Sequence, residues 1–157
     1  MPRSRSVTPA SVRSRRRATA PAHNAYLVSD LRRKTNDPWL VFTGDSLLVG
    51  DVGRPDLHAG GNPLPLARQL YDSMQRLLEL PDGVVVYPSH YGGSVCGRAL
   101  SGNPFSTIGF ERRHNGALRH GTAEAFAQAL LVDRPPPPAD QAAIVAANKR
   151  GALPARA

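Results

Sequence analysis

The chain of 157 residues has one cysteine, Cys96, and no apolar run that approaches the roughly 20 residues of a membrane helix. A single cysteine excludes an internal disulfide framework and is typical of a reducing compartment, so we expect a cytoplasmic protein. The missing apolar run excludes a transmembrane helix and a membrane partner. The 14 glycines and 15 prolines show no period, which excludes collagen and predicts a loop-rich fold for a chain that is 41% hydrophobic.

Acidic residues are missing from the first 17 positions, where six arginines give a charge of +6. Residues 18–157 hold the other 14 basic residues and all 12 acidic ones, which leaves only +2 of the total charge of +8. A scattered +2 produces no field that would hold a phosphate backbone. We therefore expect no nucleic-acid partner for the body of the chain, and any affinity for a polyanion would belong to the tail.

Residues 1–20 are rich in Ser, Arg and Pro and contain only two large aliphatic side chains, so we expect a disordered tail. Three interpretations compete: a transit-like presequence, a nucleic-acid-binding arm, or sequence that was never selected to fold. Pro2 and Pro9 weaken the amphipathic helix that a transit peptide needs, and the apolar region of a secretory signal is missing. We favour the third interpretation because the family resemblance described below stops abruptly upstream of Ala22.

Short apolar segments separated by turn residues predict a mixed α/β arrangement. Residues 25–28 and 39–42 should pair as a hairpin around a polar turn at 32–38, and residues 84–87 should form a third strand. The unbroken apolar runs at 39–42 and 84–87 predict strands that are buried on both faces. Helices are predicted over 64–80, from a Ser106 cap to Arg113, after a Thr122 cap, and over 139–149 behind a polyproline spacer at 135–138.

Two residues with metal-binding chemistry follow buried strands. Asp45 comes just after the strand at 39–42, and His90 follows the strand at 84–87. Ligands bind at the carboxyl ends of strands in α/β folds, so a carboxylate and an imidazole could converge there on a metal ion. Taken alone, each residue is more typical of a loop: an Asp after Gly at a strand end more often caps a turn, and a lone His after Pro-Ser more often forms a loop hydrogen bond.

The sequence segments around these two residues form longer motifs. Residues 42–57, FTGDSLLVGDVGRPDL, resemble the FTGD…GRxD segment of metallo-β-lactamase-fold proteins of the glyoxalase II and persulfide dioxygenase branch. Residues 87–90, YPSH, are similar to the YPxH motif of that branch, and residues 106–113, STIGFERR, resemble members that carry rhodanese domains. Residues 135–151 resemble the close of the catalytic domain in these proteins.

The resemblance implies a fold and a division of the chain. The family fold is an αββα sandwich of two similar halves, and residues 21–151 would supply the second half. Residues 1–20 would be the disordered tail, and residues 152–157 a second tail. Half a sandwich should expose an apolar sheet face and an unpaired edge, so we expect self-association or pairing with a complementing N-terminal half.

The resemblance also implies roles for individual residues. Asp45 would ligate the metal, and His90 would serve the second metal position. Arg54 and Asp56 would shape the site and meet an anionic substrate derived from a small thiol, such as a glutathione conjugate. Tyr91 is a further candidate for contact with the substrate, although persulfide dioxygenases tend to have Tyr two residues after the histidine of YPxH. The family metals are Zn or Fe, and the family reactions are hydrolysis by a metal-activated water or oxidation of a persulfide to sulfite.

The chain also departs from the family pattern. The main metal motif of the branch, H-x-H-x-D-H, lies far upstream of the FTGD segment, whereas only 44 residues precede Asp45 here and no His-x-His is present. A further ligand normally sits in H-T-P-x-H, and placing His23 at its second histidine puts Thr19 at the ligand position. We therefore expect a truncated protein that is inactive alone and binds metal weakly or not at all.

The remaining candidates do not fill the gap. His58, His114 and His120 show no ligand spacing and are typical of solvated or capping histidines. A nucleophilic Cys96 with His90 as its base is less favoured than an inert small hydrophobe. Two alternatives to an inactive fragment stay open: an enzyme whose site is completed in trans by a chain that carries H-x-H-x-D-H, and a small nucleic-acid-binding protein that uses the Arg-rich tail.

Overall fold

The computed structural model describes residues 11–17, 24–30, 37–58, 61–92, 100–132, 136 and 139–150. Five strands form one sheet in the order β1-β2-β3-β6-β7, with β1 Ser11–Arg17, β2 Asn24–Ser29, β3 Leu40–Gly44, β6 Val85–Pro88 and β7 Ser106–Thr107. Strands β3 and β6 run parallel, and the other neighbours are antiparallel. The predicted mixed α/β arrangement and the hairpin of β2 with β3 are confirmed. Residues 32–36 of the predicted turn at 32–38 lie outside the described residues.

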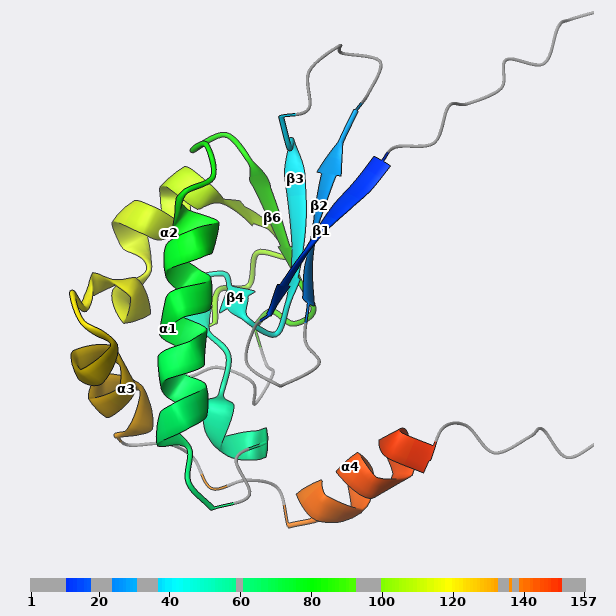
Figure 1. Ribbon diagram of the computed structural model, residues 1–157, viewed down its shortest axis with the longest axis vertical. Helices are drawn as coiled ribbons and strands as arrows, with labels where there is room; N and C mark the ends of the chain where they lie inside the picture. The colour runs from blue at the N-terminus through cyan, green and yellow to red at the C-terminus, as the bar shows by residue number, and fades with distance from the viewer. Residues whose placement is uncertain are drawn as a thin grey trace, which may run out of the picture.

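The helices α1 Leu64–Leu78, α2 Ile108–His114 and α3 Ala123–Leu131 lie on one side of the sheet (Figure 1). Apolar side chains of α1 recur at helical spacing and pack against the buried face of the strands. The core they form contains Val41, Leu70, Met74, Val86 and Phe126, all with at most 1% of their surface exposed. Helix α1 ends before Pro81-Asp82-Gly83, as the sequence predicts.

Burial alternates along the central strands, which corrects one sequence prediction. In β3, Val41 and Thr43 are fully buried, whereas Phe42 is 48% exposed. In β6, Val86 is buried and Tyr87 is 39% exposed. The prediction that both strands are buried on two faces was wrong for the described part of the chain, because α1, α2 and α3 all pack on the same side.

Side-chain caps begin the shorter helices. Thr107 begins α2 by accepting a hydrogen bond from the N–H of Phe110 (3.1 Å), so the predicted Ser106 cap was wrong by one residue. The predicted Thr122 cap of α3 is confirmed, since its hydroxyl oxygen accepts from Ala125 N–H (3.2 Å). The last helix, α4, spans Gln141–Arg150, close to its predicted range. None of the helices in the described ranges is long and apolar enough to cross a bilayer.

The structure differs from the expected disordered tail at β1. Ser11–Arg17 pairs antiparallel with β2, with Ser11 opposite Ser29 and Arg17 opposite Asn24. Pairing at the free edge of β2 uses backbone groups, so it does not require the apolar side chains that the tail lacks. Residues 1–10 and 18–20 of the expected tail lie outside the described residues.

A small hairpin, which forms a separate two-stranded sheet, follows β3. Strands β4 Leu47–Leu48 and β5 Asp51–Val52 pair antiparallel, and the 3-10 helix η2 Pro55–His58 follows them. A second 3-10 helix, η3 Gly116–Arg119, links α2 to α3. The hairpin returns the chain to the end of β3, because Gly53 N–H donates to the carbonyl of Ser46 (3.0 Å). This contact places the segment after β5 beside the residue that follows Asp45.

Candidate metal and substrate site

Asp45 and His90 meet at one edge of the sheet. Each residue follows the end of a strand, and the two strands are parallel neighbours with Gly44 opposite Pro88. The N–H of Ser89 donates to the carbonyl of Gly44 (3.0 Å), which joins the two turns. Nδ1 of His90 contacts Oδ1 of Asp45, and the two side chains are 42% and 41% exposed. The two residues therefore lie together at this end of the strands, and both remain accessible from solvent.

Hydrogen bonds from buried side chains hold the turn that carries Asp45. Gly44 has a φ of 55°, a left-handed conformation that favours glycine. The Thr43 hydroxyl donates to the carbonyl of Leu47 (2.7 Å), and the Ser46 hydroxyl donates to the carbonyl of Thr43 (2.6 Å). Thr43 and Ser46 are fully buried. The residues on both sides of Asp45 are therefore tied to the protein, and the carboxylate projects from a constrained turn.

Arg54 and Asp56 form a two-contact ion pair beside this turn. Nη2 of Arg54 lies 2.7 Å from Oδ2 of Asp56, and Nε lies 3.3 Å from Oδ1. The two side chains are only 3% and 13% exposed. The Arg54 guanidinium is therefore held by the Asp56 carboxylate in a mostly buried position.

Tyr91 follows His90 directly and is 56% exposed. The next residue, Gly92, donates its N–H to the carbonyl of Ser101 (2.8 Å), and Ser101 donates its N–H to the carbonyl of Val49 (3.1 Å). These bonds join Gly92 to Ser101 and tie Ser101 to the turn of the β4–β5 hairpin. Residues 93–99, which include Cys96, lie outside the described residues.

A buried polar network supports the hairpin, and the sequence analysis did not identify it. Glu111 of α2 is fully buried, and its Oε2 accepts hydrogen bonds from Gly50 N–H (3.0 Å) and from the Asn115 side chain (2.8 Å). Asn115 also donates to the carbonyl of Asp51 (2.9 Å). Gly50 has a φ of 83°, so the hairpin turn needs a glycine there. The spacing of four residues between Glu111 and Asn115 on a short helix is the signal that could have indicated this network.

The described residues do not form a complete metal site. No group of three or more His, Cys, Asp or Glu among them could hold a metal ion. His114 instead packs its ring against Phe110, with the ring centres 4.7 Å apart. Thr19, His23 and the side chain of His58 lie outside the described residues. Structural zinc takes four protein ligands and catalytic zinc generally three, so Asp45 and His90 alone are fewer ligands than either kind of site uses.

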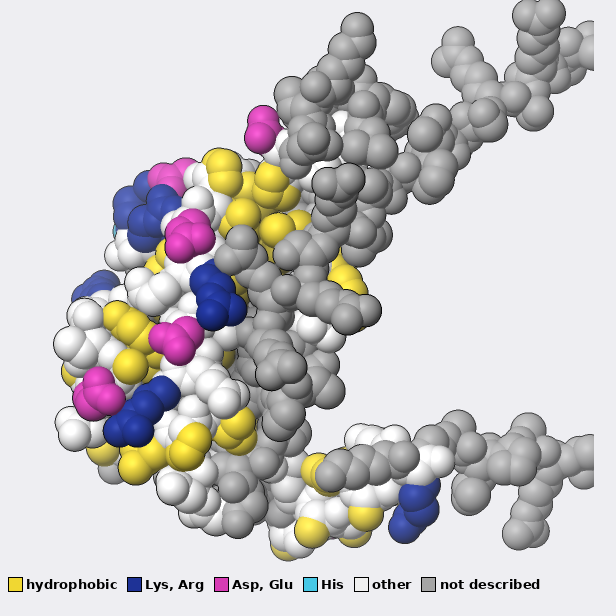
Figure 2. All heavy atoms as spheres, in the orientation of Figure 1, with side chains coloured by type: hydrophobic (Ala, Val, Ile, Leu, Met, Phe, Trp, Pro, Cys, Tyr) yellow, Lys and Arg dark blue, Asp and Glu magenta, His cyan; other side chains and the backbone are white. Residues whose placement is uncertain are grey.

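Charges alternate over the face that carries the helices (Figure 2). Arg68 lies 3.0 Å from Glu124, and Asp82 contacts both Arg112 and Arg113. Positive and negative side chains therefore neutralise each other locally on this face. This distribution agrees with the small net charge that the sequence predicts for residues 18–157.

No protein-family model matches the chain. Over 75 residues it is 41% identical to an uncharacterized protein of Mycobacterium tuberculosis, a match that covers 48% of this chain and 32% of the relative. Over 103 residues it is 35% identical to hydroxyacylglutathione hydrolase of Tolumonas auensis, covering 50% of this chain and 38% of that protein. Over 56 residues it is 38% identical to the mitochondrial persulfide dioxygenase ETHE1 of Mus musculus, covering 35% and 20%.

Two solved structures share the architecture. A metallo-beta-lactamase from Staphylococcus aureus superposes with a TM-score of 0.75 and 31% identity, over 86% of this chain and 38% of that chain. ETHE1 from Myxococcus xanthus superposes with a TM-score of 0.62 and 33% identity, over 84% and 49%. These matches confirm the resemblance to the metallo-β-lactamase fold and to its glyoxalase II and persulfide dioxygenase branch. The matched segment spans about a third of the first curated relatives, in keeping with the prediction that this chain corresponds to part of the fold.

Proposed function

We propose that this chain, whose described residues have part of the metallo-β-lactamase fold, supplies Asp45 and His90 to a metal-dependent site that acts on a glutathione thioester or persulfide. The observation that carries the proposal is the direct contact of His90 with Asp45 at adjacent ends of two parallel strands. A carboxylate oxygen and an imidazole nitrogen suit Zn or Fe. The remaining ligands would come from a segment with H-x-H-x-D-H, a pattern that the sequence lacks.

The other candidate residues would act around this pair. The ion pair of Arg54 with Asp56 would hold the wall next to Asp45 in place, since both side chains are mostly buried. Tyr91 would contact the substrate from the loop that follows His90, because its side chain is exposed. Without the missing ligands, this chain alone would be inactive.

A row of aromatic side chains offers a surface for the complementing segment. Tyr26, Phe42, Tyr87 and Phe105 are between 39% and 53% exposed. Tyr26 is the register partner of Phe42, and Phe42 is the register partner of Tyr87. The ring centres of Phe42 and Tyr87 are 5.8 Å apart, and those of Tyr87 and Phe105 are 6.0 Å apart. A contiguous apolar patch of this kind is typical of a surface that a partner covers.

Co-expression tests the proposal. The chain is produced alone and together with a fragment that carries H-x-H-x-D-H, and both samples are assayed for thioester hydrolysis and for oxygen consumption with glutathione persulfide. We expect activity in the co-expressed sample only, and the assay that responds identifies the reaction. Activity of the chain alone would contradict the proposal.

Matched variants connect that activity to the two residues. Asp45→Asn and His90→Ala should abolish it in the co-expressed sample, whereas the controls Asp72→Asn, on the exposed side of α1, and His120→Ala should retain it. Retention of activity by Asp45→Asn or His90→Ala would overturn the assignment.

A further inference from the structure

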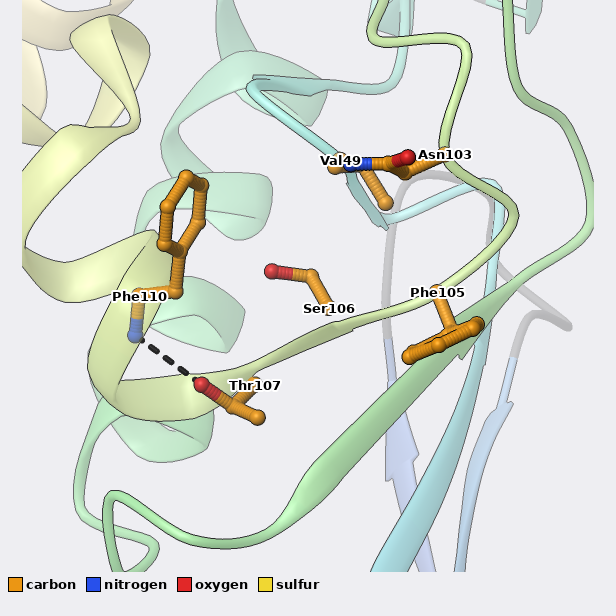
Figure 3. Close-up of a pocket in the computed structure, with 6 residues that line it drawn as sticks. All are labelled: Val49, Asn103, Phe105, Ser106, Thr107 and Phe110. Carbon is orange, nitrogen blue, oxygen red and sulfur yellow. Dashed lines mark hydrogen bonds between the residues drawn. The ribbon is translucent and has the colours of Figure 1, made fainter.

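A separate pocket lies at the outer edge of the sheet, where β7 begins. It has a volume of about 200 Å³ and is lined by six residues: Val49, Asn103, Phe105, Ser106, Thr107 and Phe110. Phe110 of α2 and Phe105 stand on either side of Ser106, and Val49 and Asn103 lie above it (Figure 3). Strand β7 is the last strand of the sheet, so the pocket opens beside an edge.

The hydroxyl of Ser106 is the unusual feature of this pocket. Ser106 is only 8% exposed, and its Oγ has no hydrogen-bond partner among the described residues. Figure 3 shows the hydroxyl pointing into the space between Phe110 and the pair Val49 and Asn103. The Thr107 hydroxyl is already used, because it caps α2 through Phe110 N–H. A buried polar group without a partner costs free energy, and a ligand atom that bonds to it would recover that loss.

The lining restricts the chemistry of the ligand. None of the six lining residues is charged, so the pocket offers no counter-ion to a charged group. Aromatic and aliphatic walls favour an apolar body. An apolar cavity of about 150 Å³ is known to hold benzene, so the pocket is of the size that accepts a single ring.

We propose that this pocket binds a small uncharged ring compound that has one hydroxyl group, with the ring between Val49 and Phe110 and the hydroxyl bonded to Ser106 Oγ. The pocket is connected to the segment after His90 through Ser101. The Ser101 hydroxyl accepts from Asn103 N–H (3.1 Å), and its carbonyl accepts from Gly92 N–H (2.8 Å). Binding should therefore change the environment of the Gly92 amide as well as that of the pocket residues. Binding to this pocket requires no metal ion.

Titration with phenol and with toluene, followed by ¹H–¹⁵N NMR of the full chain, tests this inference. The two probes have similar size, and only phenol has a hydroxyl. We expect saturable shifts of the Val49, Ser106 and Gly92 amides, with phenol binding about fivefold more tightly than toluene, as one net hydrogen bond predicts. No saturable shift, or equal affinity for the two probes, would overturn the proposal.

Two variants distinguish the contribution of the Ser106 hydroxyl to binding from that of the apolar walls. Ser106→Ala should lower the affinity for phenol to that for toluene and leave toluene unchanged. Phe110→Ala should weaken both probes because it removes one wall, and the control Val132→Ala, at an exposed position outside the pocket, should change neither. An unaltered preference for phenol in Ser106→Ala would contradict the assigned role of Ser106. Unchanged amide signals of β2 and β3, which lie away from the substituted positions, verify the fold in each variant.

Discussion

Nδ1 of His90 contacts the carboxylate of Asp45 although 45 residues separate them in the sequence. The parallel pairing of β3 with β6 brings the two together, since Gly44 and Pro88 are register partners. The contact joins two side chains that could each bind a cation. If both side chains bound one metal ion, their direct contact would have to break first.

The chain alone should bind little metal. The chain alone, dialysed after exposure to Zn²⁺ or Fe²⁺, should retain far less than one ion per molecule, because two ligands are too few for a stable site. Elemental analysis measures this. One tightly held ion per chain would show that residues within these 157 positions complete the site.

The contact between Asp45 and His90 could be expected from the sequence because each of the two positions is set by a local pattern. Asp45 and His90 each follow an apolar strand, and parallel strands place their carboxyl ends at one edge. The buried Glu111 was missed because its partner, Gly50, is 61 residues away and nothing in a helix sequence indicates which polar residue points inward. The exposure of Phe42 was missed for a related reason: an apolar run does not reveal whether one or two layers cover a strand.

Glu111→Ala should destabilise the protein strongly. The change leaves the Gly50 N–H and an Asn115 amide hydrogen without their acceptor and creates a cavity, which together should cost about 3 kcal/mol. Glu111→Gln keeps the volume and one acceptor oxygen and should cost less. Urea denaturation measures both losses.

Glu124→Ala is the matched control for Glu111. Glu124 is 63% exposed and pairs with Arg68 on the surface, so its loss should change the free energy of unfolding by less than about 0.5 kcal/mol. Similar losses for Glu111→Ala and Glu124→Ala would show that the buried network contributes little.

Gly109→Ala should also destabilise the fold. A Cβ at this position would lie 2.7 Å from the Cβ of Asp82, whose backbone carbonyl accepts a hydrogen bond from Gly109 N–H (3.0 Å). Relief of the clash has to separate α2 from the turn after α1, at a cost of roughly 1–3 kcal/mol. Gly116→Ala, where a Cβ meets nothing within 4 Å, is the control and should be close to neutral in the same thermal melts.

The aromatic row on the open face of the sheet should drive self-association when the complementing segment is missing. Tyr26, Phe42 and Tyr87 present adjacent rings from three neighbouring strands. Burial of these rings against a second copy removes apolar surface from water, which favours association. The double variant Phe42→Thr and Tyr87→Thr introduces β-branched residues, which favour strands, and removes the two central rings. Light scattering should show oligomers for the natural sequence and a shift towards monomer for the variant. A sharp monomer of the natural sequence with a cooperative melt would show that the sheet face needs no partner.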